Sequence, residues 1–196
     1  MDTLDTLTQL FQRFPGIGPR QARRFVLYLL RSSPTTRSEL ERAIHQLGTQ
    51  VHQCDDCQRF YEGTSGLCRL CRDSTRDQGQ LMLLAHDPDL EAMERTGAYH
   101  GRYFVSGGTV QFGSERDPLR MDIFQKFLTT LPALTEAIMA FPANPEGDAT
   151  AARFAEILAE KLPSVRISTL ARGLSTGSEL EYTDPHTLEH ALAHRA

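Results

Sequence analysis

The first fifty residues place apolar side chains at helical spacing in three successive segments. The spacing predicts a helix over residues 4–14, a second over 19–31, and a third that begins at Ser38, whose hydroxyl forms a capping box with Glu41. The third helix is expected to bury a stripe of four residues: Leu40, Ile44, Leu47 and Val51. Three helices of this length have too little apolar surface for a core of their own. We therefore expect them to associate with a second copy of the chain or with another module.

From residue 80 onward the pattern alternates between short apolar runs and amphipathic segments. The apolar runs predict strands at residues 81–85, 102–105, 137–141 and 165–170. The amphipathic segments predict helices at residues 87–95, 121–131 and 145–162, and a last helix that begins at Asp184-Pro185. Asp87-Pro88 and Asn144-Pro145 each have the form of an N-cap followed by the first helical residue. Such β-α alternation is typical of a mostly parallel sheet flanked by helices. The predicted fold class is α/β, preceded by a helical bundle.

All four cysteines fall in one pattern, Cys54-x2-Cys57-x10-Cys68-x2-Cys71. Two CxxC pairs let each turn direct two thiolates at one point, and four thiolates complete a closed tetrahedral shell around Zn²⁺. A closed shell leaves no position for water, so such an ion is structural and replaces a hydrophobic core in a short segment. Two disulfides or four independent thiols are the alternatives. The paired spacing and a reducing compartment favour one zinc ion per chain.

The composition is that of a soluble globular protein, with 40% hydrophobic and 23% charged residues. No apolar run reaches the roughly 18 residues of a membrane span, and the N-terminus lacks the pattern of a secretory signal. We therefore expect a cytoplasmic protein without membrane contact. The net charge of −4 argues weakly against nucleic acid, but residues 1–76 carry 11 Lys and Arg against 8 Asp and Glu. The positive excess thus lies in the first third of the chain.

A glycine turn joins the first two predicted helices. Gly16 and Gly18 permit backbone angles and close approaches that a side chain would block. The first amides of the following helix point outward, where a phosphate oxygen can accept hydrogen bonds from them. Positive charge on the same turns comes from three residues: Arg20, Arg23 and Arg24. The alternative is a tight turn that touches no ligand. The arginines favour DNA, bound through its backbone and so without sequence preference.

Taken in order, these features resemble the RecR family of bacterial recombination mediators over nearly the whole chain. The resemblance lies in the glycine hairpin, the cysteine cluster and several short motifs. These are Phe14–Arg24, the cysteines with Thr64 and Arg76, Glu94-Arg95-Thr96-Gly97, Gly107-Gly108, Glu146-Gly147-Asp148-Ala149-Thr150, Leu170-Ala171-Arg172-Gly173-Leu174, and Leu180-Glu181-Tyr182. The resemblance implies a homodimer or homotetramer that clamps DNA and acts with RecO, and often RecF, to load the recombinase. It also implies that the α/β part is a Toprim domain.

The resemblance suggests four parts. They are a helix-hairpin-helix module for DNA binding and dimerisation (1–53), a four-cysteine zinc finger (54–76), the Toprim domain (77–172) and a C-terminal oligomerisation segment (173–196).

A catalytic Toprim domain holds magnesium with a Glu after its first strand and with acidic residues after a later strand. Here His86 stands at the first position, and residues 141–144 depart from the family pattern, although Glu146 and Asp148 are present. Losing an oxygen ligand weakens a magnesium site, which favours a protein that is not an enzyme. In the family this surface contacts RecO, which makes Glu146 and Asp148 the expected partner-binding residues. The alternative is a metal-dependent nuclease or primase-like enzyme that uses these acids with Asp87.

Overall fold

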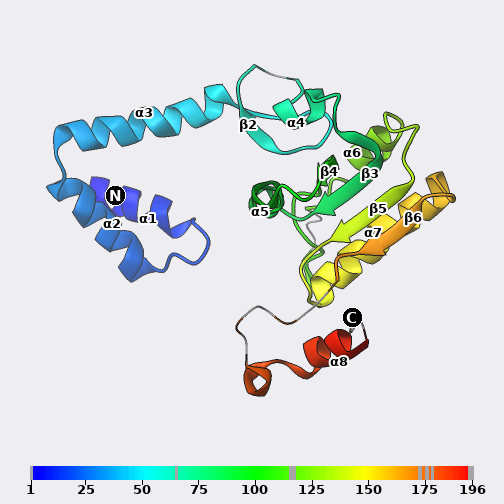
Figure 1. Cartoon of the computed structure of the whole chain (residues 1–196). Helices are drawn as coiled ribbons and strands as arrows, with labels where there is room; N and C mark the ends of the chain where they lie inside the picture. The colour runs from blue at the N-terminus through cyan, green and yellow to red at the C-terminus, as the bar shows by residue number, and fades with distance from the viewer. Residues whose placement is uncertain are drawn as a thin grey trace. The chain divides into compact units, whose positions relative to one another are not determined.

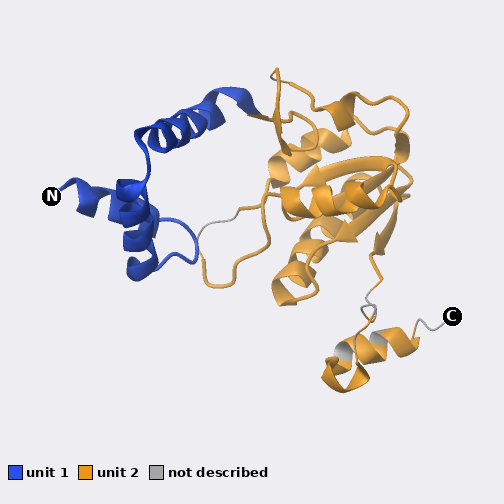
Figure 2. Ribbon diagram, turned by 60° about the vertical axis from the view of Figure 1, so that its left-hand side comes forward, with its two compact units in different colours: residues 1–51 blue, residues 52–196 orange. Residues whose placement is uncertain are grey.

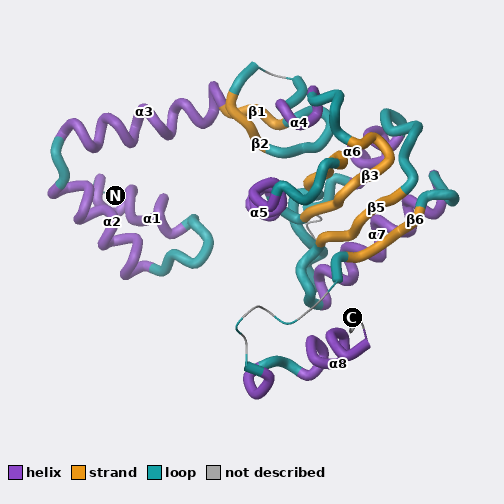
Figure 3. The backbone as a smooth tube through the Cα atoms, in the orientation of Figure 1, coloured by secondary structure: helices purple, strands orange, loops and turns teal. Residues whose placement is uncertain are grey.

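The computed structural model describes residues 2–64, 66–114, 118–171, 174, 177 and 179–193. The chain divides into two compact units, Met1–Val51 and His52–Ala196 (Figure 2). The first unit contains helices α1 (Thr3–Gln12), α2 (Pro19–Arg31) and α3 (Pro34–Gln50) (Figures 1 and 3). Its last residue opens a small two-stranded sheet of β1 (Val51–Gln53) and β2 (Phe60–Glu62). The second unit continues with α4 (Arg69–Arg72), β3 (Asp77–Leu84), α5 (Asp87–Thr96), β4 (Gly101–Val105), α6 (Met121–Leu128), β5 (Glu136–Ala140), α7 (Pro145–Lys161), β6 (Arg166–Thr169), the 3-10 turn η1 (Leu180–Tyr182) and α8 (Pro185–Ala193).

Helix α3 begins one turn earlier than the sequence pattern predicted. Its N-cap is Ser33, whose side-chain oxygen accepts a hydrogen bond from the Thr36 amide at 3.1 Å, and Pro34 is the first helical residue. The predicted start at Ser38 is therefore wrong. A serine followed by proline supplies both a cap and a fixed φ angle, so this pair starts the helix before the Ser38–Glu41 pair is reached.

The N-terminal unit does not close an apolar core within one chain. No residue of α1 or α3 is buried, and α2 buries only Ala22 and Val26. The expected burial of the α3 stripe is wrong for the single chain, since Ile44 is 60% exposed and Leu47 is 63% exposed. An open apolar groove of about 540 Å³ lies beside Phe14 and other side chains of this unit. Apolar surface of this extent is normally covered by a partner.

The second unit is built on a four-stranded, entirely parallel sheet with strand order β4-β3-β5-β6. The predicted strands are confirmed with shifts of one residue at most ends, and β3 extends back to Asp77. In the centre, Met82 of β3 lies opposite Tyr103 of β4 and Ile138 of β5. This parallel α/β architecture agrees with the predicted fold class.

Successive side chains along the strands point alternately into two separate cores, one on each face of the sheet. Leu81, Leu83 and Phe104 face one side, where the core is completed by α6 and α7. Met82 and Leu84 face the other side, where the core includes Leu90 of α5, the Tyr103 ring and cysteines of the 54–71 segment. Figure 1 shows α7 along the sheet opposite the side taken by α5. The cysteine segment is therefore part of a layer of the α/β unit.

Helix α8 begins at Pro185, as predicted from Asp184-Pro185. Before it, Leu180 is 63% exposed and Tyr182 is 80% exposed. Residues 173, 175, 176, 178 and 194–196 of the expected C-terminal oligomerisation segment lie outside the described residues. Within the described part, no helix has both the length and the apolar character needed to cross a bilayer.

Gly147 offers a direct test of the packing at the start of α7. A Cβ atom at this position would lie 1.9 Å from the Pro142 carbonyl oxygen. We expect Gly147→Ala to destabilise the α/β unit by about 3 kcal/mol, because the loop must move aside. As a control, Gly48→Ala in α3 meets no atom within 4 Å and should stabilise its helix by up to about 1 kcal/mol. Urea denaturation followed by circular dichroism measures both; a neutral Gly147→Ala would contradict the close approach of the Pro142 loop to the helix.

Candidate nucleic-acid interface and metal centre

The glycine hairpin between α1 and α2 is formed by residues 13–18. Gly16 has a φ angle of +75°, which favours glycine, and the Ile17 amide donates to the Phe14 carbonyl at 3.1 Å. Gly18 is the N-cap of α2 with a φ angle of −81°, and an added Cβ would meet nothing within 4 Å. The fold therefore requires glycine at position 16, whereas the expected conformational need at Gly18 is wrong. The missing side chain at Gly18 leaves room for an external group.

The N-terminus of α2 presents unpaired donors. Gly18 provides no side-chain cap, and Pro19 has no amide hydrogen. The Arg20 and Gln21 amides have no acceptor among the described residues, because the first bond of the helix runs from the Ala22 amide to the Gly18 carbonyl. Unpaired amides at a helix N-terminus favour an anion.

The three predicted arginines lie around these amides. The Arg20, Arg23 and Arg24 side chains are exposed, and none has an ion-pair or hydrogen-bond partner in the described part of the chain. The buried residues Ala22 and Val26 lie on the opposite face of α2. The arrangement therefore combines free amides, unpaired positive charge and space for a close approach.

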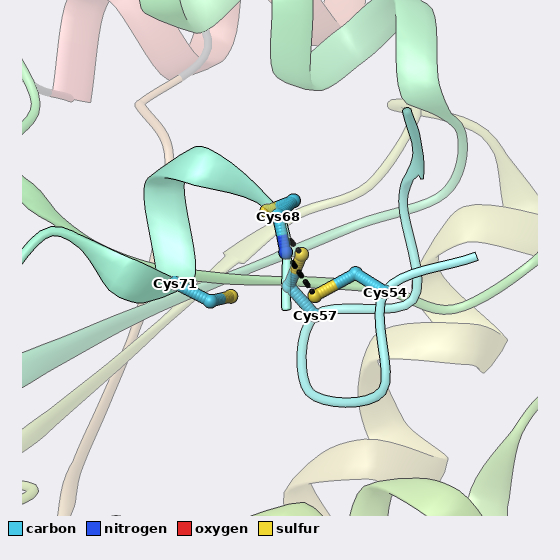
Figure 4. A group of neighbouring side chains, drawn as sticks. All are labelled: Cys54, Cys57, Cys68 and Cys71. Atoms are coloured by element: carbon cyan, nitrogen blue, oxygen red, sulfur yellow. Dashed lines mark hydrogen bonds between the residues drawn. The ribbon is translucent and has the colours of Figure 1, made fainter. Parts of the chain in front are cut away.

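The four cysteines converge in the second unit (Figure 4). Cys54 and Cys57 come from the turn after β1, whereas Cys68 and Cys71 lie at the start and within α4. Their four sulfur atoms all lie within 4.8 Å of one another, and the Sγ atoms of Cys57 and Cys68 are 3.6 Å apart. Sulfurs bound to one tetrahedral zinc ion are separated by about 3.8 Å. The side chains present thus fit a metal ion, with Cys71 the least buried of the four.

Hydrogen bonds between the crowded sulfurs shift the pKa values of Cys54 and Cys57 in opposite directions. Hydrogen bonding with the Cys57 thiol lowers the pKa of Cys54 far below its usual value, while the same contact raises the pKa of Cys57. The Cys68 amide also donates to the Cys54 sulfur at 3.3 Å. A divalent cation that replaces the shared protons would neutralise part of the thiolate charge, as metal binding to thiols requires their deprotonation.

Long-range contacts attach the cysteine segment to the sheet. The Val105 amide at the end of β4 donates to the Cys57 carbonyl at 2.8 Å. Arg120 donates to the Gln58 carbonyl at 2.9 Å and to the Val105 carbonyl at 3.1 Å. Arg102 of β4 forms an ion pair with Asp56 at 3.0 Å, and both side chains are largely buried. Sequence reasoning missed these anchors because their partners are distant in the chain and no local pattern marks them.

The candidate Toprim acids do not gather into a metal site. Strand β3 ends at Leu84, and the two residues that follow are a fully buried Ala85 and an exposed His86, so neither supplies a carboxylate. Glu146 and Asp148 lie in the first turn of α7, as expected. Among the described residues, the four cysteines are the one group of three or more metal-ligating side chains.

The caps of α5 and α7 explain part of the acidic pattern. Asn144 caps α7 as predicted, since its Oδ1 atom accepts from the Gly147 amide at 2.8 Å. The predicted cap of α5 is wrong: His86, and not Asp87, is the N-cap, and the His86 amide donates to Asp89 at 3.0 Å. Asp87 accepts instead from the Phe60 amide of the cysteine segment, at 2.7 Å. Its carboxylate is therefore engaged in a structural contact.

Comparison with known proteins identifies three parts of the chain. Family models match a RecR helix-hairpin-helix at residues 4–47, a Toprim domain at 79–171 and a RecR C-terminal region at 173–196. Three relatives are called recombination protein RecR. The protein of Chloroflexus aggregans (strain MD-66 / DSM 9485) is 40% identical over 191 residues, covering 96% of this chain and 91% of the relative. That of Ruegeria pomeroyi (strain ATCC 700808 / DSM 15171 / DSS-3) is 37% identical over 194 residues, covering 98% and 95%. That of Magnetococcus marinus (strain ATCC BAA-1437 / JCM 17883 / MC-1) is 36% identical over 197 residues, covering 100% and 96%. With its hairpin, its Toprim sheet and relatives that match it from end to end, this chain belongs to the RecR family.

Proposed function

We propose that the chain is a DNA-binding mediator of recombination and repair that clamps DNA and helps RecO, often with RecF, to load the recombinase. The observation that carries the DNA contact is the N-terminus of α2, where unpaired amides and three unpaired arginines lie together. Such a site suits phosphate oxygens, which every DNA sequence presents. Binding is therefore independent of sequence. The name of the relatives supports the role in recombination.

A clamp requires self-association through two surfaces, because a single two-fold interface stops at a dimer. The first surface is the open apolar face of α1–α3, which includes the exposed Ile44 and Leu47. The second is the C-terminal segment, where Leu180 and Tyr182 are exposed. Both surfaces carry large apolar side chains that a single described chain leaves in water, which favours assembly into a homodimer or homotetramer.

The metal of the cysteine cluster is Zn²⁺, one per chain, held by Cys54, Cys57, Cys68 and Cys71. Four thiolates select zinc over the hard cations, and a complete tetrahedral shell leaves no position for a reacting water molecule. The ion is structural: it holds together a segment that also forms part of the core beneath the sheet. Zinc thus contributes to the stability of the Toprim domain.

The Toprim domain serves as a platform for a partner and does not catalyse DNA cleavage. The end of β3 supplies no carboxylate, and Asp87 is bound to the Phe60 amide. Glu146 and Asp148 occupy the first turn of α7, where the helix dipole stabilises negative charge. These two acids present a negative surface to RecO. The nuclease alternative uses the same acids and needs a metal ligand that the described residues around them do not provide.

Loss of one cysteine tests the zinc site. Cys57→Ser should leave three ligands, lower zinc affinity more than about 100-fold and lower the melting temperature, because metal binding supplies folding free energy to the segment. Ser74→Ala, an exposed change close to the cluster, should keep the metal. Zinc content by atomic emission, together with thermal unfolding, measures both effects. Wild-type protein purified without chelator and found nearly free of zinc would refute the site.

Loss of two hairpin arginines tests the DNA contact. Arg20→Ala with Arg24→Ala should weaken binding equally for unrelated duplexes and reduce the slope of log affinity against log salt concentration by about two. Arg31→Ala with Arg42→Ala removes two exposed charges elsewhere in the unit and should change the slope less. Fluorescence anisotropy over a salt series gives these values. Unchanged affinity and slope in the first variant would remove the hairpin from the DNA site.

A charge placed on α3 tests the first self-association surface. Leu47→Glu should dissociate the N-terminal contact, because a carboxylate at a 63% exposed apolar position would have to be buried on association. Ser38→Glu adds the same charge at an exposed polar position of the same helix and should leave assembly intact. Sedimentation velocity at tens of micromolar protein distinguishes the species. Identical mass distributions for both variants and the wild type would count against this surface.

A further inference from the structure

We propose that Asp87 is a positioning residue for the four-cysteine site, and that through it zinc retention is coupled to the start of α5 at the carboxyl edge of the Toprim sheet. The inference rests on the proposed zinc occupancy and goes beyond it, since it assigns a role in metal retention to a residue that is not a ligand. It begins from the contact between the Asp87 carboxylate and the Phe60 amide, at 2.7 Å.

The backbone from Cys57 to Phe60 is held from outside at three points. Val105 donates to the Cys57 carbonyl, Arg120 to the Gln58 carbonyl, and the Phe60 amide donates to Asp87. All three anchors belong to the α/β part of the unit. Asp87 is the one acceptor among them, and it acts three residues after a proposed zinc ligand. A charged acceptor makes a stronger hydrogen bond than a neutral one.

The segment between these anchors needs external support. Gln58 has a φ angle of +63°, and it is the one non-glycine residue with a positive φ angle in the part of the chain that the structure describes. Such a conformation is unfavourable for a residue with a side chain and persists only where surrounding contacts enforce it. The Gln58 side chain is 6% exposed and donates to the Cys54 carbonyl at 2.9 Å. The strained residue therefore connects the two ligands of the first CxxC pair with the external anchors.

Asp87 is free for this task because other residues cap its own helix. His86 is the N-cap of α5, and Asp89 accepts from the His86 amide. The negative charge of Asp87 also acts on Arg120: burial lowers the pKa of this arginine, and attraction by the Asp87 carboxylate acts against that shift. One carboxylate at the start of α5 thus binds the Phe60 amide and acts electrostatically on the half-buried Arg120.

Coupling of this kind is reciprocal. Zinc fixes Cys54 and Cys57 and so presents the Phe60 amide to Asp87. Asp87 in turn holds the chain in the conformation that keeps both thiolates directed at the metal. Loss of zinc would release Gln58 from its strained conformation and free the Asp87 carboxylate, which loosens the start of α5 beside the exposed His86.

The test compares Asp87→Ala, Asp87→Asn and Glu91→Gln in the full-length zinc protein. Zinc release to an excess of a chromogenic chelator should be about fivefold faster for Asp87→Ala, because the acceptor is lost. Asp87→Asn keeps an oxygen that can accept the bond and should release zinc at a rate between those of Asp87→Ala and the wild type. Glu91→Gln removes one exposed charge from the same helix and should match the wild type.

Hydrogen exchange tests the other half of the coupling, namely whether bound zinc stabilises the start of α5. Removing zinc from the wild type should speed amide exchange in residues 86–90 as well as in residues 57–62, and leave residues 150–158 of α7 protected. A wild-type rate of zinc release from Asp87→Ala, in protein that holds one zinc per chain, would overturn the role of Asp87 and leave the zinc site standing. Unchanged exchange in residues 86–90 after zinc removal would overturn the coupling. Absence of zinc from the wild type would overturn both the site and this inference.

Discussion

The packing of the four-cysteine segment against one face of the parallel sheet is the interaction on which the second unit depends. A parallel sheet must be covered on both faces. Helices α6 and α7 complete the core on one face, whereas the other core combines α5 with buried cysteines of a segment that has little regular structure of its own. That segment needs its turns cross-linked to serve as a layer, and one zinc ion held by four thiolates, as we propose, would provide the cross-link. The metal site and the Toprim domain are therefore best understood as one structural unit.

The N-terminal unit, in contrast to the second unit, does not cover its apolar surface within one chain. Its helices leave Ile44 and Leu47 in water, which favours the association with a second copy that we propose. In the proposed DNA clamp, the helices that would join two subunits also carry the hairpin that we propose binds phosphate. Such association would place at least two copies of the proposed Arg20–Arg24 site on one assembly, and two linked sites bind one DNA molecule more tightly than either alone. The proposed function therefore links affinity for DNA to assembly through the same helices.

Local signals in the sequence predict much of this arrangement. The apolar runs locate all four strands of the parallel sheet, and the double CxxC spacing identifies the four sulfurs that converge in space. Errors occur where two possible caps lie within a few residues of each other: Ser33 and not Ser38 caps α3, and His86 and not Asp87 caps α5. The contacts of Arg102, Arg120 and Asp87 with the cysteine segment could not be predicted, because each joins residues 27 to 62 positions apart and depends on the finished fold.

The central claim is that the chain assembles on DNA as a zinc-containing clamp and leaves the DNA intact. Native mass spectrometry after incubation with single- and double-stranded DNA in the presence of magnesium or manganese tests it most directly. The account predicts a dimer or tetramer with one zinc per chain, bound to DNA of full length. A monomer that binds no DNA, or DNA shortened in a metal-dependent way, would contradict it.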